Sequence, residues 1–129
     1  MKLTHFEDLD CWKEARKLTR LIYEAIGRNP IWQRDVRLCG QIQAASVSVM
    51  SNIAEGLVRH SDKEFVQFLF IAMSSAAEVQ SHLYVAIDQK YISQESFDEM
   101  YAQAEKTGKI ISGLIKYLRT KTRQTRQTS

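Results

Sequence analysis

Hydrophobic residues recur at helical spacing in four successive segments of the chain. Each segment repeats apolar side chains every three or four residues, which is the pattern of a helix with one buried face. The segments cover about residues 10–27, 31–57, 62–88 and 94–118. Because only short turns separate them, the pattern predicts an all-α protein, an antiparallel up-down-up-down four-helix bundle.

Local signals place several helix ends. Asn29-Pro30 predicts a turn, with Pro30 as the first helical position of the second segment. The sequence SDKE predicts a capping box, in which Ser61 accepts from the backbone N–H of Glu64 and the Glu64 side chain reaches back to Ser61. Ser93 is the expected N-cap of the fourth helix.

The apolar pattern stops after Leu118. The last stretch, RTKTRQTRQTS, contains no apolar side chain, so we expect a basic, disordered tail over residues 119–129 after a bundle domain over residues 1–118. Charge is also distributed unevenly. Residues 1–105 hold 11 of the 18 basic residues and all 15 acidic ones, a net charge of −4, whereas residues 106–129 hold seven basic residues and no acidic one. The C-terminal end is therefore the expected contact for anionic ligands.

The third helix carries two apolar stripes. The first is the expected core face: Phe65, Phe68, Leu69, Ala72, Ala76, Val79, Leu83, Ala86 and Ile87. The second lies about 110° around the helix from the first and consists of Val66, Phe70, Met73, Ala77 and Tyr84. It is either the edge of a wide core face or a subunit interface. We favour the interface, and hence a homo-oligomer, because a soluble monomer seldom exposes such a patch.

Composition favours a soluble protein of the cytoplasm. The chain has 129 residues, of which 44% are hydrophobic and 26% charged, the profile of one globular domain. The N-terminus lacks the apolar run of a signal peptide, and no window resembles a membrane span. Cys11 and Cys39 belong to no metal-binding or redox motif, so we expect reduced thiols.

Motifs for metal binding and catalysis are missing from the sequence. A di-metal site in a bundle needs Glu-x-x-His pairs, and His5, His60 and His82 form none. Glu78 precedes His82 by four residues, which predicts a surface or interface contact rather than a ligand pair. The chain also has no phosphate-binding loop and no nucleophile motif. We therefore expect a non-enzyme that uses no metal or cofactor.

A polar pair, Asn52 and Glu55, stands beside Gly56 near the end of the second helix. The glycine can end the helix, and a carboxylate near a helix C-terminus needs a compensating partner. Arg59, Lys63 or the N-terminal amides of the next helix can supply that partner. The pair is either a polar lock at the corner between the second and third helices, which we favour, or a direct ligand contact.

Several segments together resemble a known protein family. They are FEDLDCWKEARKLTRLIY (6–23), QIQAASVSVMSNIAEG (41–56), SDKEFVQFLFIAMSSAAEVQSHL (61–83) and KYIS (90–93). They resemble the four-helix bundle proteins encoded by intervening sequences in bacterial 23S ribosomal RNA genes, over about residues 6–118. The positions that match family motifs include Asn52, Glu55, Gly56 and Glu78.

That family includes the accessory variability proteins of diversity-generating retroelements. Those proteins look like barrel-shaped homopentamers that bind nucleic acid and a reverse transcriptase through basic surfaces. The resemblance therefore implies a homopentamer, with a nucleic acid and a protein such as a reverse transcriptase as partners.

Two functions fit these expectations. The first is a small oligomer that binds RNA or another nucleic acid as an accessory or scaffold protein. Its expected contacts are the basic residues Lys109, Lys116, Arg119, Lys121, Arg123 and Arg126. Such side chains suit sequence-independent phosphate contact, although the same tail can instead serve only to solubilise the helix end. The second is a protein–protein adaptor whose second apolar stripe binds a different protein. A metal- or cofactor-dependent enzyme ranks behind both.

Overall fold

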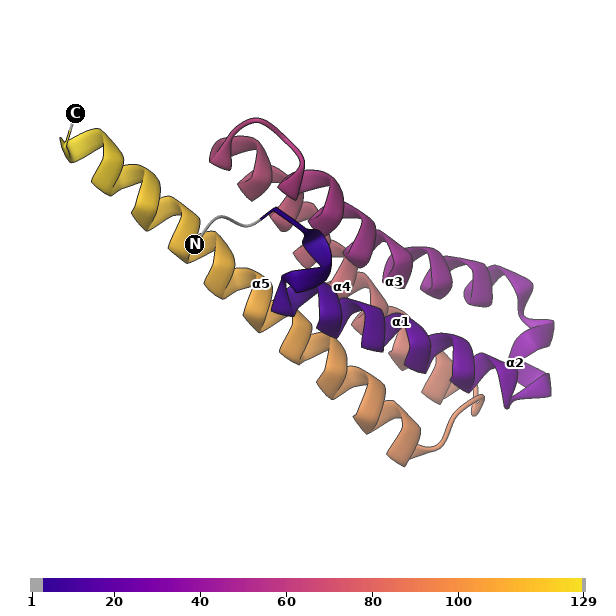
Figure 1. Cartoon of the computed structure of the whole chain (residues 1–129). Coiled ribbons are helices and arrows are strands. Elements are labelled where there is room, and N and C mark those ends of the chain that lie inside the picture. The colour runs from indigo at the N-terminus through magenta and orange to yellow at the C-terminus, as the bar shows by residue number, and fades with distance from the viewer. Residues whose placement is uncertain (1–3, 129) are drawn as a thin grey trace.

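The computed structural model describes the backbone of residues 4–128 and the side chains of residues 4–121. Within these residues every regular element is a helix: η1 (Phe6–Asp8), α1 (Asp10–Gly27), α2 (Pro30–Arg34), α3 (Val36–Leu57), α4 (Asp62–Asp88) and α5 (Gln94–Thr128). The long helices α1, α3, α4 and α5 lie together as an elongated bundle (Figure 1). The predicted all-α bundle is therefore confirmed.

Each long helix packs chiefly against two of the others. α1 contacts α3 and α5, and α4 contacts the same two helices, so α1 and α4 occupy opposite corners of the bundle. The interior holds two clusters of buried side chains. The cluster at the end that carries α2 includes Leu18, Ile22, Trp32, Ile42, Leu83 and Phe97. The other includes Ala15, Val49, Ile53, Leu69, Ile111 and Leu118.

The second predicted helix is broken at Asp35, so the expectation of one continuous helix over 31–57 is wrong. The Asp35 side chain accepts from the backbone N–H of Leu38 at 3.1 Å and thereby caps α3. It also accepts from the hydroxyl of Tyr91 at 2.9 Å. The break turns α2 so that Trp32 is fully buried. Val36, expected on the buried face, is instead 76% exposed at the first position of α3.

The helix starts at Ser61 and Ser93 are confirmed. Ser61 accepts from the backbone N–H of Glu64 at 3.2 Å, and Ser93 accepts from that of Ser96 at 3.1 Å. The C-terminal end of α4 is formed by a left-handed residue, Lys90, which has a φ of 63°. There the Tyr91 N–H donates to the carbonyl of Ala86 at 2.9 Å, which is the six-to-one bond of a Schellman motif.

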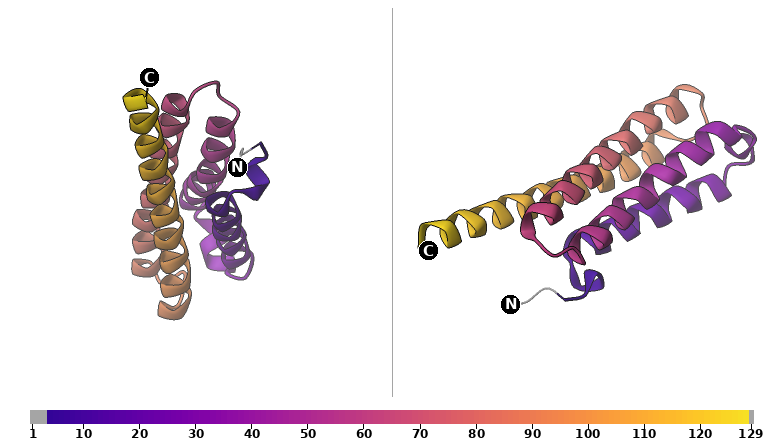
Figure 2. Two further views of the ribbon diagram at one scale, coloured as in Figure 1. Left: turned by 60° about the vertical axis from the view of Figure 1, so that its left-hand side comes forward. Right: turned by 90° about the horizontal axis from the view of Figure 1, so that it is seen from above.

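The last helix is longer than the sequence pattern predicts. α5 continues to Thr128, beyond Leu118, and extends past the other helices (Figure 2). A disordered tail from residue 119 is expected from the missing apolar residues, whereas the described backbone is helical there. Arginine, lysine and glutamine are good helix formers, so the loss of a buried face does not by itself end a helix. None of the described helices has both the length and the hydropathy to cross a membrane.

Candidate nucleic-acid and assembly interface

Asn52 belongs to a hydrogen-bonded link between α3 and α4. Its side-chain amide donates to the carbonyl of Ser48 at 2.8 Å and to the Ser48 hydroxyl at 3.0 Å. The same hydroxyl lies 2.9 Å from the hydroxyl of Ser75 on α4. Small side chains thus let the two helices approach closely at this point.

Glu55 pairs with Arg59, one of the three partners that the sequence offers. The Arg59 Nη2 lies 2.8 Å from the Glu55 carboxylate, and the guanidinium carbon lies 4.7 Å from the ring centre of Phe68 on α4. Both charged side chains are about half exposed, at 52% for Glu55 and 41% for Arg59. An exposed ion pair of this kind contributes about 0.2–1 kcal/mol. The pair lies at the end of α3 and reaches α4 only through the contact of Arg59 with Phe68, and the polar lock stays a prediction.

Gly56 allows the close approach of α3 and α4 rather than ending α3. A β-carbon placed there would lie 2.7 Å from the β-carbon of Phe68 and 2.9 Å from Cδ1 of Phe65. Gly56 does not have a positive φ, and α3 continues to Leu57. Gly56, which the sequence offers as a possible helix end, lies inside the helix instead, because the packing of the neighbouring helix decides the residue type here.

Glu78 and His82 meet on the surface of α4. The His82 Nε2 lies 3.2 Å from the Glu78 carboxylate, as their spacing predicts. Among the described side chains, no three histidine, cysteine, aspartate or glutamate residues come together in a way that could hold a metal ion. This pair is therefore a surface contact without further metal ligands around it in the described structure.

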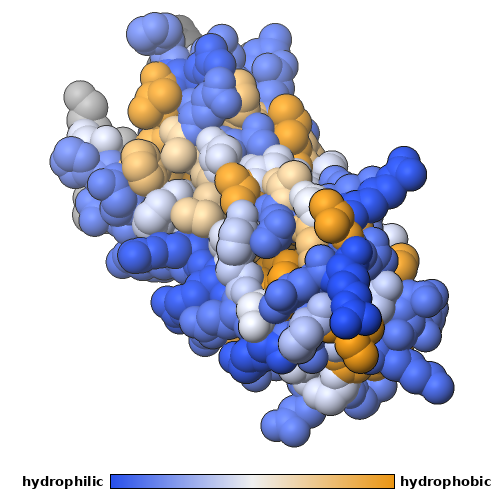
Figure 3. Space-filling view, turned by 90° about the vertical axis from the view of Figure 1, so that its right-hand side faces the viewer, coloured by the Kyte–Doolittle hydropathy of each residue, from blue (hydrophilic) through white to orange (hydrophobic). Residues whose placement is uncertain are grey.

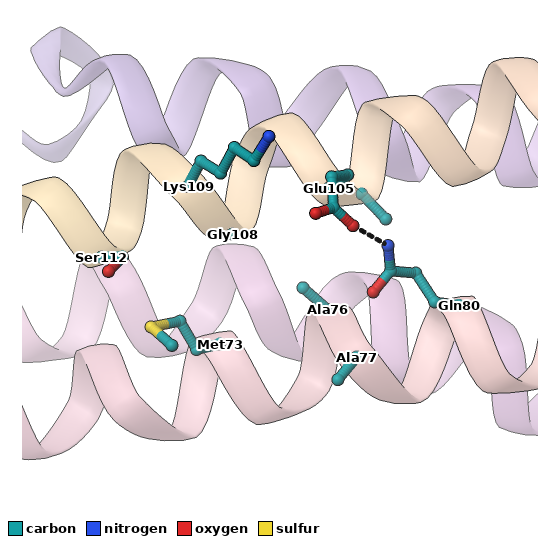
Figure 4. A pocket seen from close by; sticks show the side chains of 9 residues that line it. Met73, Ala76, Ala77, Gln80, Glu105, Gly108, Lys109 and Ser112 are labelled. Carbon is teal, nitrogen blue, oxygen red and sulfur yellow. Dashed lines mark hydrogen bonds between the residues drawn. The ribbon is translucent and has the colours of Figure 1, made fainter.

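An open groove runs between α4 and α5, and it contains the middle of the second apolar stripe. One part, of about 290 Å³, is lined from α4 by Met73, Ala76 and Ala77 and from α5 by small residues such as Gly108 and Ser112 (Figure 4). At one end Gln80 donates to Glu105 at 2.9 Å (Figure 4). A second part, of about 380 Å³, shares Met73 and Ser112 and includes Phe70.

Predicted RNA contacts lie in this same groove. Lys109 lines the first part, and Lys116 and Arg119 line the second. The Arg119 guanidinium carbon lies 5.0 Å from the ring centre of Phe70, at cation–π distance. The structure thus brings together the two residue sets that the sequence pattern predicts separately.

The remaining predicted residues are less central to the groove. Lys121 lies 3.8 Å from Asp62 at the start of α4. Val66 is partly buried against the core, and the exposed Tyr84 packs edge-on against Phe97 with ring centres 5.0 Å apart. The predicted contacts Arg123 and Arg126 lie outside the residues whose side chains are described.

Other surfaces differ from this groove. On the side of the molecule where α2 lies, hydrophobic side chains form separate small areas among hydrophilic ones (Figure 3). α1, in contrast, presents a row of exposed cations that the sequence analysis did not single out: Lys13, Arg16, Lys17 and Arg20. The sequence signal for this row is a spacing of three, four and seven residues within one helix.

The fold places the chain in the class of all-α helical bundle proteins. A family model described as 23S rRNA-intervening sequence protein matches residues 7–113, and the chain belongs to that family. The resemblance predicted from the sequence is thereby confirmed at the level of the family. A solved structure of a protein of unknown function from the S23 ribosomal protein family of Bacteroides thetaiotaomicron VPI-5482 has the same fold, with a TM-score of 0.74. It is 22% identical and the match covers 82% of this chain and 98% of that one. No curated protein matches the chain.

Proposed function

We propose that this protein is a non-enzymatic oligomer that binds RNA in the cytoplasm as an accessory or scaffold protein. The observation that carries the proposal is the α4–α5 groove, where exposed apolar side chains of α4 lie beside exposed cations of α5. An apolar surface favours association between copies, and cations along a helix favour contact with phosphates.

Three finer points belong to the proposal. The long helices alternate in direction as an antiparallel up-down-up-down bundle, which the Tyr91–Asp35 hydrogen bond between two chain reversals supports. By resemblance, the oligomer is a pentamer. By the same resemblance, a reverse transcriptase is the protein partner that we would test first.

The assembly part is tested by Phe70→Asp. Phe70 is 41% exposed, so the substitution leaves the core intact while placing a charge in the groove. Light scattering coupled to size exclusion should show a smaller particle, with helix content retained. Val47→Asp is the matched control, because Val47 is 40% exposed on α3 and lies outside the groove. A Phe70→Asp protein with the wild-type mass would remove this interface.

The RNA part is tested by measuring affinity for a short single-stranded RNA across a salt series. Binding through phosphate contacts should weaken steeply between about 50 and 200 mM salt. The double variant Lys116→Gln/Arg119→Gln should lower both the affinity and its salt dependence. A wild-type oligomer that does not bind RNA at low salt would contradict this function.

A protein–protein adaptor is the second candidate function. It is favoured by the apolar side chains of the groove, among them the exposed Phe70 and the partly buried Met73, which suit another protein as well as a second copy. Specific capture of a different protein after nuclease treatment, abolished by Phe70→Asp but not by Val47→Asp, would favour the adaptor over the RNA scaffold.

A further inference from the structure

The outer face of α1 carries a continuous row of cations, here called the α1 basic stripe: Lys13, Arg16, Lys17 and Arg20. All four side chains belong to exposed residues. The buried residues of α1 include Ala15, Leu18 and Ile22. At about 100° per residue, the stripe is centred on the side of the helix opposite this buried face. The stripe therefore points directly away from the core.

These cations form few ion pairs within the chain. Among the side chains that the structure describes, Lys13, Arg16 and Lys17 form no ion pair, and Arg20 lies 3.9 Å from Glu24 with both groups at least half exposed. Such an exposed pair holds its charges weakly. The stripe is thus available to an external anion, because no strong contact within the protein has to be broken before the anion binds.

The acidic residue nearest the middle of the stripe is turned toward α5. Glu14 accepts from the side-chain amide of Gln103 at 3.0 Å and lies 3.3 Å from the Lys106 ammonium. The Gln103 hydrogen bond, with Lys106 and Lys17 adding to it, holds the pKa of Glu14 below its usual range. Its negative charge is therefore matched by groups on α5 as well as on α1, which reduces its effect on an anion bound at the stripe.

The stripe borders an open groove with an aromatic side chain in it. The groove has a volume of about 430 Å³ and is lined by the four cations together with Glu7, Trp12 and Glu14. Trp12 is partly exposed and packs edge-on against Phe6, with ring centres 5.1 Å apart. From Lys13 to Arg20 the helix rises about 10 Å, enough to contact two neighbouring phosphates of one strand. Cations beside an aromatic ring that is at least partly accessible are the combination that single-stranded nucleic acids bind.

We infer that the α1 basic stripe, with Trp12, is a second RNA-binding surface that holds the phosphates of a single strand. This inference rests on the proposed function, because it requires that the protein bind RNA. It adds a surface at the opposite corner of the bundle from α4, separate from the α4–α5 groove.

The test is the double variant Arg16→Gln/Lys17→Gln, with a fluorescein-labelled short single-stranded RNA as the probe. Both side chains are exposed and make no ion pair within the described structure, so thermal stability should be unchanged. Two lost phosphate contacts should reduce the slope of log affinity against log salt by about 1.4, and affinity near 0.1 M salt should fall roughly tenfold or more. The control is Arg34→Gln/Arg37→Gln, which removes the same charge from exposed positions on α2 and the start of α3.

The outcomes separate this inference from the proposed function. If the wild-type protein does not bind the RNA, both fail. If Lys116→Gln/Arg119→Gln weakens binding and Arg16→Gln/Lys17→Gln does not, the proposed function stands and the α1 surface is wrong. An equal loss of RNA affinity in the Arg34→Gln/Arg37→Gln control would mean that the effect depends only on the net charge of the protein. That result would overturn the inference. Wild-type binding to phosphatidylserine vesicles, lost in the α1 variant while RNA affinity is unchanged, would assign the stripe to a membrane surface instead.

Discussion

Replacing Gly56 by alanine should destabilise the protein, although alanine is the better helix former. The helix-propensity gain is at most about 1 kcal/mol. Against it stands a β-carbon 2.7 Å from the β-carbon of Phe68, where carbon atoms prefer about 3.5–4.0 Å. The Phe68 β-carbon is attached directly to the α4 backbone, so no side-chain rotation relieves the contact. α4 has to retreat by roughly 1 Å, and overpacking of this kind costs about 1–3 kcal/mol or more. The expected net loss is about 1–2 kcal/mol.

Thermal unfolding followed by far-UV circular dichroism measures this loss. For a chain of this length the melting temperature should fall by roughly 3–8 °C. Gly40→Ala is the control in the same helix, because nothing lies within 4 Å of a β-carbon at Gly40. It should raise the melting temperature by roughly 2–4 °C, through propensity alone. Light scattering must show the same mass for both variants. A Gly56→Ala protein that melts at or above the wild-type temperature would refute the close-packing role of this glycine.

Three further predictions concern other parts of the bundle. Asp35→Ala should cost about 1–2 kcal/mol in urea unfolding, because it removes the α3 cap and the partner of the Tyr91 hydroxyl; Tyr91→Phe, which loses only the hydroxyl, should cost less. Lys90→Gly should raise the melting temperature by roughly 2–4 °C, because glycine adopts the left-handed conformation without steric cost; a lower melting temperature would contradict this. Burial raises the pKa of Cys11 to about 11, so the folded protein holds this proton more tightly than the unfolded chain. Stability should therefore fall as pH rises from about 9 toward 11, an effect that Cys11→Ala should reduce but not abolish, because burial also raises the pKa of Cys39.

The predicted fold is correct where local signals and the hydrophobic pattern agree. Ser61 and Ser93 each precede a helix and accept from the backbone as their positions predict. The break at Asp35 is missed because the apolar residues on both sides continue a helical period, and the reason for the break is the burial of Trp32 in the bundle. Such a tertiary contact has no local signature. The length of α5 is underestimated because the end of an apolar pattern marks the end of burial, not of the helix.

The sequence predicts the separate parts of the candidate site but not how they come together. The second stripe of α4 and the cations of α5 are both visible in the sequence, but their meeting depends on how the two helices are rotated against each other. That rotation places Arg119 over Phe70, a contact between residues far apart in the sequence. The α1 basic stripe is missed for a different reason. The net charge of residues 1–105 is negative, and this sum hides four cations that share one helical face. The spacing of these four cations, taken at the helical period like that of the apolar residues, predicts the stripe.

The two proposed RNA surfaces respond differently to assembly. Lys116 and Arg119 line the groove that contains Phe70, so a second copy bound there would cover part of the α5 surface. The α1 basic stripe faces away from the core at the opposite corner from α4, so it stays exposed if the neighbouring copy meets the groove with a face other than α1, and the oligomer then multiplies it. In the assembled protein, Arg16→Gln/Lys17→Gln should therefore cause the larger loss of RNA affinity. In a Phe70→Gln background, which opens the groove without adding a carboxylate beside Arg119, Lys116→Gln/Arg119→Gln should cause the larger loss. The same order of effects in both backgrounds would mean that assembly leaves the α4–α5 groove uncovered.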